Sequence, residues 1–182
     1  MVETMQVVGT LCALAAGVGA LLLIIARLLA SHWGLAARWG AAVASQRPVL
    51  TLVVAAGSML GSLYFSEEAG YIPCRLCWFQ RIAMYPIALV ALVALVRRDR
   101  GARWYIVPMA GIGAAISSWH YLVEWNPTWE GTSCGLFGPA CSEIWFRTWG
   151  FSTLAFMALC GFVSIIVYNT VTFPRSDQQE QS

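Results

Sequence analysis

The sequence predicts an all-α integral membrane protein, built as a four-helix transmembrane bundle core with an additional N-terminal transmembrane helix. Of the 182 residues, 59% are hydrophobic and 11% are charged, and the mean hydropathy is +0.66. A soluble core cannot absorb this much apolar surface, so a soluble all-helical protein is disfavoured. The apolar residues also fall into five segments near the roughly 20 residues that span a bilayer core. These segments are 5–30, 49–66, 77–96, 104–124 and 149–172.

The first segment, residues 5–30, is interpreted as a retained helix. No basic residue precedes it, and its apolar run is longer than the core of a secretory signal, although Ala-rich stretches can be cut. Together with the connection that follows, it forms a unit of residues 1–48 in front of a core of residues 49–172. The polar residues 173–182 are expected to be a disordered cytoplasmic tail.

The distribution of arginine predicts how the helices are oriented. The chain has no lysine, so all eleven basic residues are arginines. Eight of them lie at one predicted membrane surface, which the positive-inside rule assigns to the cytoplasm. They are Arg27, Arg38, Arg47, Arg97, Arg98, Arg100, Arg103 and Arg175. Two pairs of cysteines then lie on the extracytoplasmic side, where disulfides persist.

The first pair, Cys74 and Cys77, follows Pro73, a residue suited to the first turn of a helix. A thiolate at either cysteine would face the positive end of the helix dipole, which lowers a thiol pKa. On a helix, Arg81 is expected on the same face, about 6 Å deeper than Cys77. An arginine at that depth is costly unless it reaches lipid phosphate or a polar partner. We therefore expect either snorkelling or an electron acceptor that becomes anionic on reduction.

The second pair, Cys134 and Cys141, lies in an outer loop rich in glycine, proline, serine and threonine. The spacing permits a disulfide without proving it. Residues 143–147, which follow, are expected to form a short amphipathic stretch at the membrane surface. Such a loop could exchange disulfides with the first pair. Cys12 and Cys160 lie inside apolar spans and are interpreted as buried free thiols without a role.

The segment PCRLCWFQRIAMYP, from Pro73 to Pro86, resembles the signature of the disulfide bond formation protein B (DsbB) family. Cys134 and the run from Gly138 to Cys141 resemble its BdbC-like branch, which has a short second loop. The resemblance covers residues 49–172. It implies a thiol:quinone oxidoreductase of the bacterial cytoplasmic (inner) membrane that reoxidises a DsbA-like thioredoxin-fold partner. The expected cofactor is ubiquinone or menaquinone from the membrane pool, and no nucleic acid is expected to bind.

The same resemblance implies a role for each paired cysteine. The partner's thiolate would attack Cys134, giving a mixed disulfide that Cys141 resolves. The loop dithiol would then be reoxidised by Cys74 and Cys77, and Cys77 would deliver the electrons to quinone. On this basis all four cysteines are candidate catalytic residues.

Three further residues are candidates for quinone binding. Arg81 matches the arginine that the family places beside the quinone, where it would stabilise negative charge on a carbonyl oxygen. His120 matches a histidine at the outer end of the following helix and could move a proton near neutral pH. It could equally be an interfacial histidine among aromatic residues. Glu124, one turn later, stands where the family has an amide. No metal site is expected.

Three other interpretations stay open. A vitamin K epoxide reductase-like enzyme uses two cysteine pairs in the same way, but its loop pair precedes the membrane pair in sequence. A transporter that carries reducing electrons outward would not require quinone. A non-enzymatic membrane protein could use the four cysteines as a zinc site or as two structural disulfides.

Overall fold

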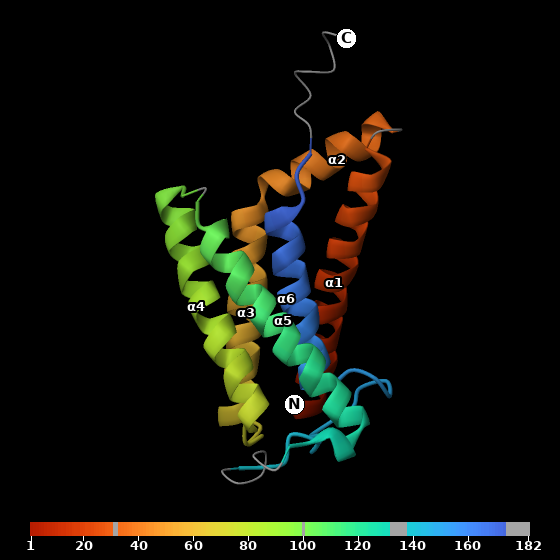
Figure 1. Cartoon of the computed structure of the whole chain (residues 1–182), viewed down its shortest axis with the longest axis vertical. Helices are drawn as coiled ribbons and strands as arrows, with labels where there is room; N and C mark the ends of the chain where they lie inside the picture. The colour runs from red at the N-terminus through yellow and green to blue at the C-terminus, as the bar shows by residue number, and fades with distance from the viewer. Residues whose placement is uncertain (31–32, 100, 132–137, 174–182) are drawn as a thin grey trace.

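The computed structural model describes residues 1–30, 33–99, 101–131 and 138–173. Within these ranges the chain forms α-helices and one short 3-10 helix, η1, and contains no β-strand. All the α-helices except α2 run along a bundle, whereas α2 lies across one end of it (Figure 1). The helices are α1 (Val2–Leu29), α2 (Gly34–Ser45), α3 (Arg47–Glu67), α4 (Arg75–Arg97), α5 (Arg103–Trp125), η1 (Pro127–Trp129) and α6 (Leu154–Thr170).

The lengths and composition of the helices confirm the predicted fold class. Helices α1, α3, α4 and α5 are long and apolar enough to cross a membrane, and α6 is a shorter apolar helix of 17 residues. Large apolar side chains are exposed on their outer faces, as contact with lipid requires. They include Leu21, Leu28, Val53, Leu60, Ile82, Leu89, Val96 and Ile112. The structure is therefore a bundle of α3 to α6 with the additional helix α1.

The last helix begins later than the apolar pattern predicts. Residues 148–152 instead form a tight turn, in which the Thr148 N–H donates to the Ser152 carbonyl over 2.9 Å and Gly150 has a φ of +80°. The Thr153 side chain then caps α6, because its Oγ1 accepts from the Phe156 N–H at 3.3 Å. Because of this turn and this cap, α6 begins at Leu154. The predicted amphipathic stretch 143–147 is not helical.

Helix α2 falls within the connection that the sequence assigned to no helix. Its Gly40 lies against Phe173, three residues after the end of α6, and a side chain at Gly40 would overlap that ring. Glycine therefore allows the close approach of α2 to the bundle. As a result the N-terminal unit contributes a cover over one end of the core as well as a membrane helix.

The core of the bundle lies between α3, α4, α5 and α6. Its centre contains Ile87, Phe162 and Ile165, all fully buried. Helix α1 packs on α6, with Leu23 and Ala20 against Val167 and Tyr168. Polar contacts fix this packing: Thr10 Oγ1 lies 3.0 Å from Ser152 Oγ, and the Tyr168 hydroxyl donates to the Ala16 carbonyl at 3.3 Å.

Gly113 marks the closest approach of α5 to α6 and supports a test of this packing. A Cβ atom at Gly113 would overlap the buried ring of Phe162, whereas a Cβ at Gly111 meets nothing within 4 Å. We expect Gly113→Ala to lower the free energy of unfolding by about 1–3 kcal/mol through overpacking. Thermal unfolding in detergent measures this, with Gly111→Ala as the matched control. Equal unfolding temperatures for the two variants would contradict the described contact.

Candidate active site

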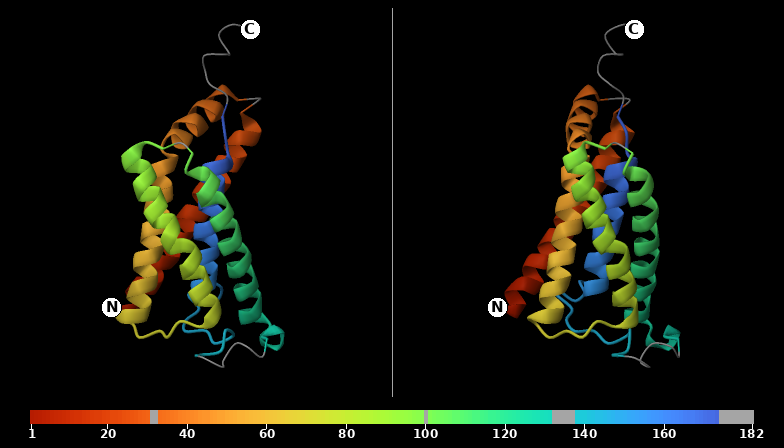
Figure 2. Two further views of the ribbon diagram at one scale, coloured as in Figure 1. Left: turned by 60° about the vertical axis from the view of Figure 1, so that its left-hand side comes forward. Right: turned by 90° about the vertical axis from the view of Figure 1, so that its left-hand side faces the viewer.

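The predicted site residues that the structure describes, all except Cys134, gather at the end of the bundle opposite α2. The beginning of α4, the last turns of α5 and the segment that leads into α6 meet there (Figure 2). The N-terminus of α1 lies at this same end (Figure 1). Three parts of the chain that are distant in sequence therefore supply one site.

The two cysteines of the first pair lie at the beginning of α4. Cys74 is the N-cap residue, and its Sγ accepts from the Cys77 N–H at 3.3 Å. The two sulfur atoms lie 2.9 Å apart, with the Cys74 thiol donating to Cys77, and both are free cysteines. Donation to Cys77, followed by burial, raises the pKa of the Cys74 thiol. The pKa of Cys74 is therefore raised, whereas the helix dipole alone would lower it.

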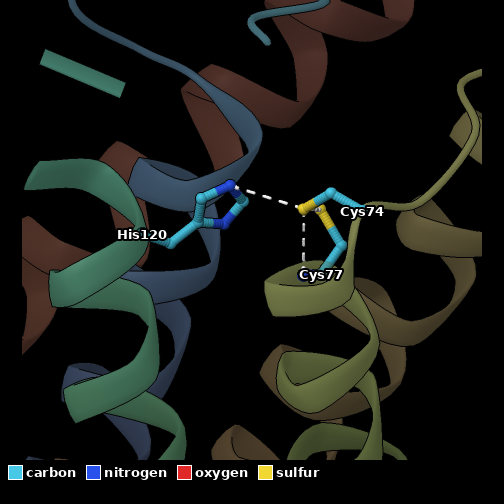
Figure 3. A group of neighbouring side chains, drawn as sticks. All are labelled: Cys74, Cys77 and His120. Carbon is cyan, nitrogen blue, oxygen red and sulfur yellow. Dashed lines mark hydrogen bonds between the residues drawn. The ribbon is translucent and has the colours of Figure 1, made fainter. Parts of the chain in front are cut away.

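His120 of α5 faces the first pair (Figure 3) and also contacts the backbone of the loop that carries the second pair. Its Nε2 lies 3.6 Å from Cys74 Sγ and 3.1 Å from the backbone oxygen of Cys141. A carbonyl oxygen can only accept, so Nε2 carries a proton. The Nδ1 atom lies 3.0 Å from Gln80 Nε2, which donates to it. His120 is therefore held as the neutral Nε2–H tautomer, facing the sulfur of Cys74.

Gln80 is a residue that sequence reasoning missed. It is buried on α4, one turn after Cys77, and its amide fixes the tautomer of His120. A polar side chain in a membrane helix, spaced three residues from a cysteine, was the available signal. Nothing in the sequence says that its partner lies on α5.

Glu124 lies beside His120, one turn later on the same helix, as the sequence predicted. Its Oε1 is 4.0 Å from His120 Nε2, and its Oε2 accepts from Thr153 Oγ1 at 2.6 Å. Because Thr153 also caps α6, Glu124 ties the end of α5 to the beginning of α6. Both His120 and Glu124 are buried.

Arg81 was expected on the same helix face as the two cysteines, but its side chain binds Ser62 of α3. Its Nε donates to Ser62 Oγ and its Nη2 to the Ser62 carbonyl, both over 2.9 Å. The guanidinium also lies over the Trp78 ring, 5.3 Å from its centroid. Arg81 thus points towards α3, whereas Cys74 points towards α5. A polar partner on the neighbouring helix offsets the cost of the charge at this depth.

The second pair is only partly described, because Cys134 lies outside the described residues. Cys141 is buried and packs in one cluster with Cys74 and Val123. The segment is anchored by Glu130, whose carboxylate accepts from the Cys141 N–H and from the Ser142 hydroxyl. Sequence reasoning gave Glu130 no role, and its position in a loop offered no signal.

A small cavity lies between these residues and the segment before α6. Cys74, Cys77, His120, Glu124, residues 143–146, Thr153 and Leu154 line it. Trp145 stacks on Tyr71 with ring centroids 5.0 Å apart, and Phe146 lies 5.4 Å from Phe65 by the same measure. The cavity has a volume of about 10 Å³, and Trp145 and Phe146 are the aromatic residues of a lining that is otherwise polar or aliphatic.

The same residues also contain metal-ligand chemistry. The sulfur atoms of Cys74 and Cys77 and a ring nitrogen of His120 lie within 4.8 Å of one another. Zinc accepts thiolate and imidazole ligands and usually takes four in a structural site. Across the part of the chain that the structure describes, no fourth residue of a ligand type joins this group.

The remaining cysteines lie apart from this cluster. Cys160 is half-buried on α6, with its Sγ near Gly17 of α1. Cys12 is exposed on the surface of α1, so the prediction of burial is wrong for it. The reason is that Cys12 lies on the face of α1 turned away from α6. These two thiols provide matched controls for the paired cysteines.

Comparison with known proteins covers most of the chain, including the segments that carry this site. The family model "Disulfide bond formation protein DsbB" matches residues 46–172, and α1 and α2 precede the match. "Disulfide bond formation protein C" of Bacillus subtilis (strain 168) is 46% identical over 116 residues, covering 64% of this chain and 84% of that protein. "Probable disulfide formation protein C 1" of Bacillus anthracis is 43% identical over 110 residues, covering 59% and 78%. No solved structure shows significant similarity to the chain. The chain therefore belongs to the DsbB family and is a multi-pass membrane oxidoreductase of disulfide bond formation.

Proposed function

We propose that the protein is a thiol:quinone oxidoreductase that reoxidises a DsbA-like thioredoxin-fold partner. A partner dithiol and a quinone would yield a partner disulfide and a hydroquinone, so two electrons and two protons are transferred. The electrons would pass from the partner to Cys134 and Cys141, then to Cys74 and Cys77, then to ubiquinone or menaquinone. The observation that carries the proposal is the position of His120, which contacts both Cys74 and the backbone of Cys141.

The exchange between the pairs is supported by the packing of Cys141 against Cys74. A Cys141 thiolate would attack Cys74 in an oxidised first pair, forming a Cys74–Cys141 disulfide and releasing Cys77 as a thiolate. Attack by Cys134 on Cys141 would then restore the loop disulfide and release Cys74. The Nε2–H of His120 faces that leaving sulfur and can donate to it. Burial keeps other thiols away from the exchanging atoms.

The electron acceptor would approach Cys77 and Arg81. Only two N–H groups of the Arg81 guanidinium are used, both on Ser62, so within the described residues further donors remain for an anionic oxygen. Trp78, over whose ring the Arg81 guanidinium lies, would offer a flat apolar surface to a planar ring. A quinone bound there would supply a two-electron acceptor. The fixed positive charge of Arg81 would stabilise negative charge as it develops on that acceptor.

The charge distribution supports an extracytoplasmic position for both pairs. Within the described residues, six arginines lie at the end of the bundle that carries α2, opposite the cysteines. By the positive-inside rule this end faces the cytoplasm. The six are Arg27, Arg38, Arg47, Arg97, Arg98 and Arg103. A soluble extracytoplasmic partner would then reach the loop that contains the second pair.

Coupled turnover by the purified protein tests the proposal. Reduced DsbA-like protein and a soluble quinone are supplied in detergent, and quinone absorbance and partner thiols are followed together. We expect one quinone to be reduced for each partner disulfide formed. Partner oxidation that needs no quinone would contradict the acceptor. Absence of turnover with ubiquinone and menaquinone analogues, together with stoichiometric zinc in the reduced protein, would favour the metal site that Cys74, Cys77 and His120 could form.

A further inference from the structure

A second and much larger cavity lies at the opposite end of the bundle. Its volume is about 1040 Å³, and it lies between α2 and the adjoining ends of α3, α4, α5 and α6. None of the cysteines that the structure describes lines it. Helix α2 supplies one wall and precedes the part of the chain that the family model matches. The oxidoreductase reaction proposed above makes no use of this cavity.

Positive charge surrounds the cavity. Arg38 of α2, Arg47 of α3, Arg98 after α4 and Arg103 of α5 all line it, and Asp99 is the single acidic residue among its lining residues. The Asp99 carboxylate accepts from the Gly101 N–H at 2.7 Å. Within the described ranges, none of the four arginines forms an ion pair with a carboxylate. The cavity therefore presents uncompensated cationic donors, which suits an anion.

The interior of the cavity has a different character. Ala41 and Ala44 of α2 and Ala91 and Ala94 of α4 all line it, and these small side chains leave the space open. Thr51 and Asn169 lie deeper: both are buried, and the Asn169 amide donates to Thr51 Oγ1 at 2.9 Å. The buried polar groups thus satisfy each other. A cationic rim over small apolar walls fits an amphiphile with an anionic head.

Exposed aromatic residues indicate that this end lies at the level of lipid headgroups. Trp33, the N-cap residue of α2, and Trp39 within α2 are exposed. Trp104 and Tyr105 are exposed in the first turn of α5. Tryptophan and tyrosine concentrate at the membrane–water boundary because one part of the ring system is polar and the rest apolar. A ligand that enters the cavity from this level would be a membrane lipid.

We propose that this cavity binds an anionic phospholipid, with its phosphodiester held by the arginines and the first part of its acyl chains along the alanines. Arginine pairs with phosphate through several parallel N–H donors, and basic pockets between membrane helices on the cytoplasmic side bind such headgroups. A free phosphate would satisfy the arginines but not the apolar walls. The lipid would link α2 to α3, α4 and α5, which gives the N-terminal unit a binding role.

Lipid binding to the full-length protein tests this proposal without reference to activity. Native mass spectrometry in mild detergent measures the affinity for added phosphatidylglycerol and, separately, for phosphatidylcholine. We expect a clear preference for phosphatidylglycerol. The double variant Arg38→Gln/Arg103→Gln should weaken its binding about thirtyfold, since each arginine near an anionic lipid contributes about fivefold.

Two further variants distinguish lipid binding inside the cavity from general attraction of the lipid to the charged membrane surface. Arg27→Gln/Arg97→Gln removes the same charge from the last turns of α1 and α4, at the same end, but neither residue lines the cavity. This control should bind phosphatidylglycerol as the wild type does. Ala41→Phe keeps every charge and fills the cavity, so it should also weaken lipid binding at least tenfold.

Three outcomes would overturn the proposal. The first is equal weakening by the two double variants, which would indicate surface attraction alone. The second is full phosphatidylglycerol binding by Ala41→Phe, which would place the lipid outside the cavity. The third is displacement of phosphatidylglycerol by millimolar inorganic phosphate, which would identify a phosphate site. A thermal unfolding scan of each variant confirms that it is folded before binding is measured.

Discussion

Cys77→Ser is expected to abolish turnover with quinone, lowering the rate at least about a thousandfold. A serine oxygen cannot form or break a disulfide, so the first pair can no longer accept electrons from the loop. The coupled quinone assay measures this loss. The same loss is expected for serine at Cys74, Cys134 and Cys141, because each step of the relay needs both members of a pair.

Cys12→Ser and Cys160→Ser are the matched controls for this prediction. Each also replaces a thiol in a membrane helix, but both lie apart from the cavity beside the first pair. They should keep the wild-type rate. Full activity of Cys77→Ser, or loss of activity in either control, would contradict the proposed relay.

The Cys77→Ser variant also reports which loop sulfur exchanges with Cys74. Since Cys141 packs against Cys74, a Cys74 thiolate should attack the loop disulfide at Cys141, forming a Cys74–Cys141 disulfide and releasing Cys134 as a thiolate. Without Cys77 this disulfide cannot be converted into a first-pair disulfide, so it should accumulate. Peptide mapping under non-reducing conditions detects it. A disulfide from Cys134 to Cys74 in place of this one would reverse the proposed order within the loop pair.

His120→Ala is expected to have the second largest effect and to slow electron transfer between the pairs about a hundredfold. The variant loses the N–H that faces the sulfur of Cys74 and the carbonyl of Cys141. The pH–rate profile of the wild type should contain an ionisation that the variant lacks. Identical profiles at equal rates would show that His120 only fills space.

Gln80→Met tests whether the tautomer of His120 matters for the rate, because His120 itself is kept in this variant. Methionine has nearly the size of glutamine but cannot donate to Nδ1, so the Nε2–H tautomer is no longer held. We expect a rate loss of about tenfold and a shifted pH–rate profile, smaller than the effect of His120→Ala. Gln6→Met is the control, because Gln6 donates to the Tyr71 hydroxyl at the same end of the bundle without contacting His120. An equal effect of both methionine variants would assign the loss to general destabilisation.

The sequence by itself determined the all-helical membrane fold and the place of the first cysteine pair at the beginning of a helix. The length of an apolar segment is a property of one stretch of chain, so it can be predicted without knowledge of how the helices pack. Pro73 and the cysteines at the beginning of a span are likewise a local pattern. The spacing of His120 and Glu124, one turn apart, follows from helix geometry alone.

Only the tertiary structure decided which of these residues meet. Gln80 and His120 lie on different helices, and their contact depends on how α4 packs against α5. Arg81 shares a predicted helix face with the cysteines, yet Ser62 on α3 draws its long side chain the other way. A flexible side chain follows the nearest hydrogen-bond partner, and that partner is supplied by a neighbouring helix.

The cavity under α2 is another feature that could not be predicted from the sequence. In the sequence, the four arginines that line it, from Arg38 to Arg103, are separate indications of the cytoplasmic side. Their arrangement around one space arises because Gly40 lets α2 pack against Phe173, in the segment that follows α6. Charge and hydropathy are additive along a chain, whereas a binding site depends on distances between segments, which packing alone determines.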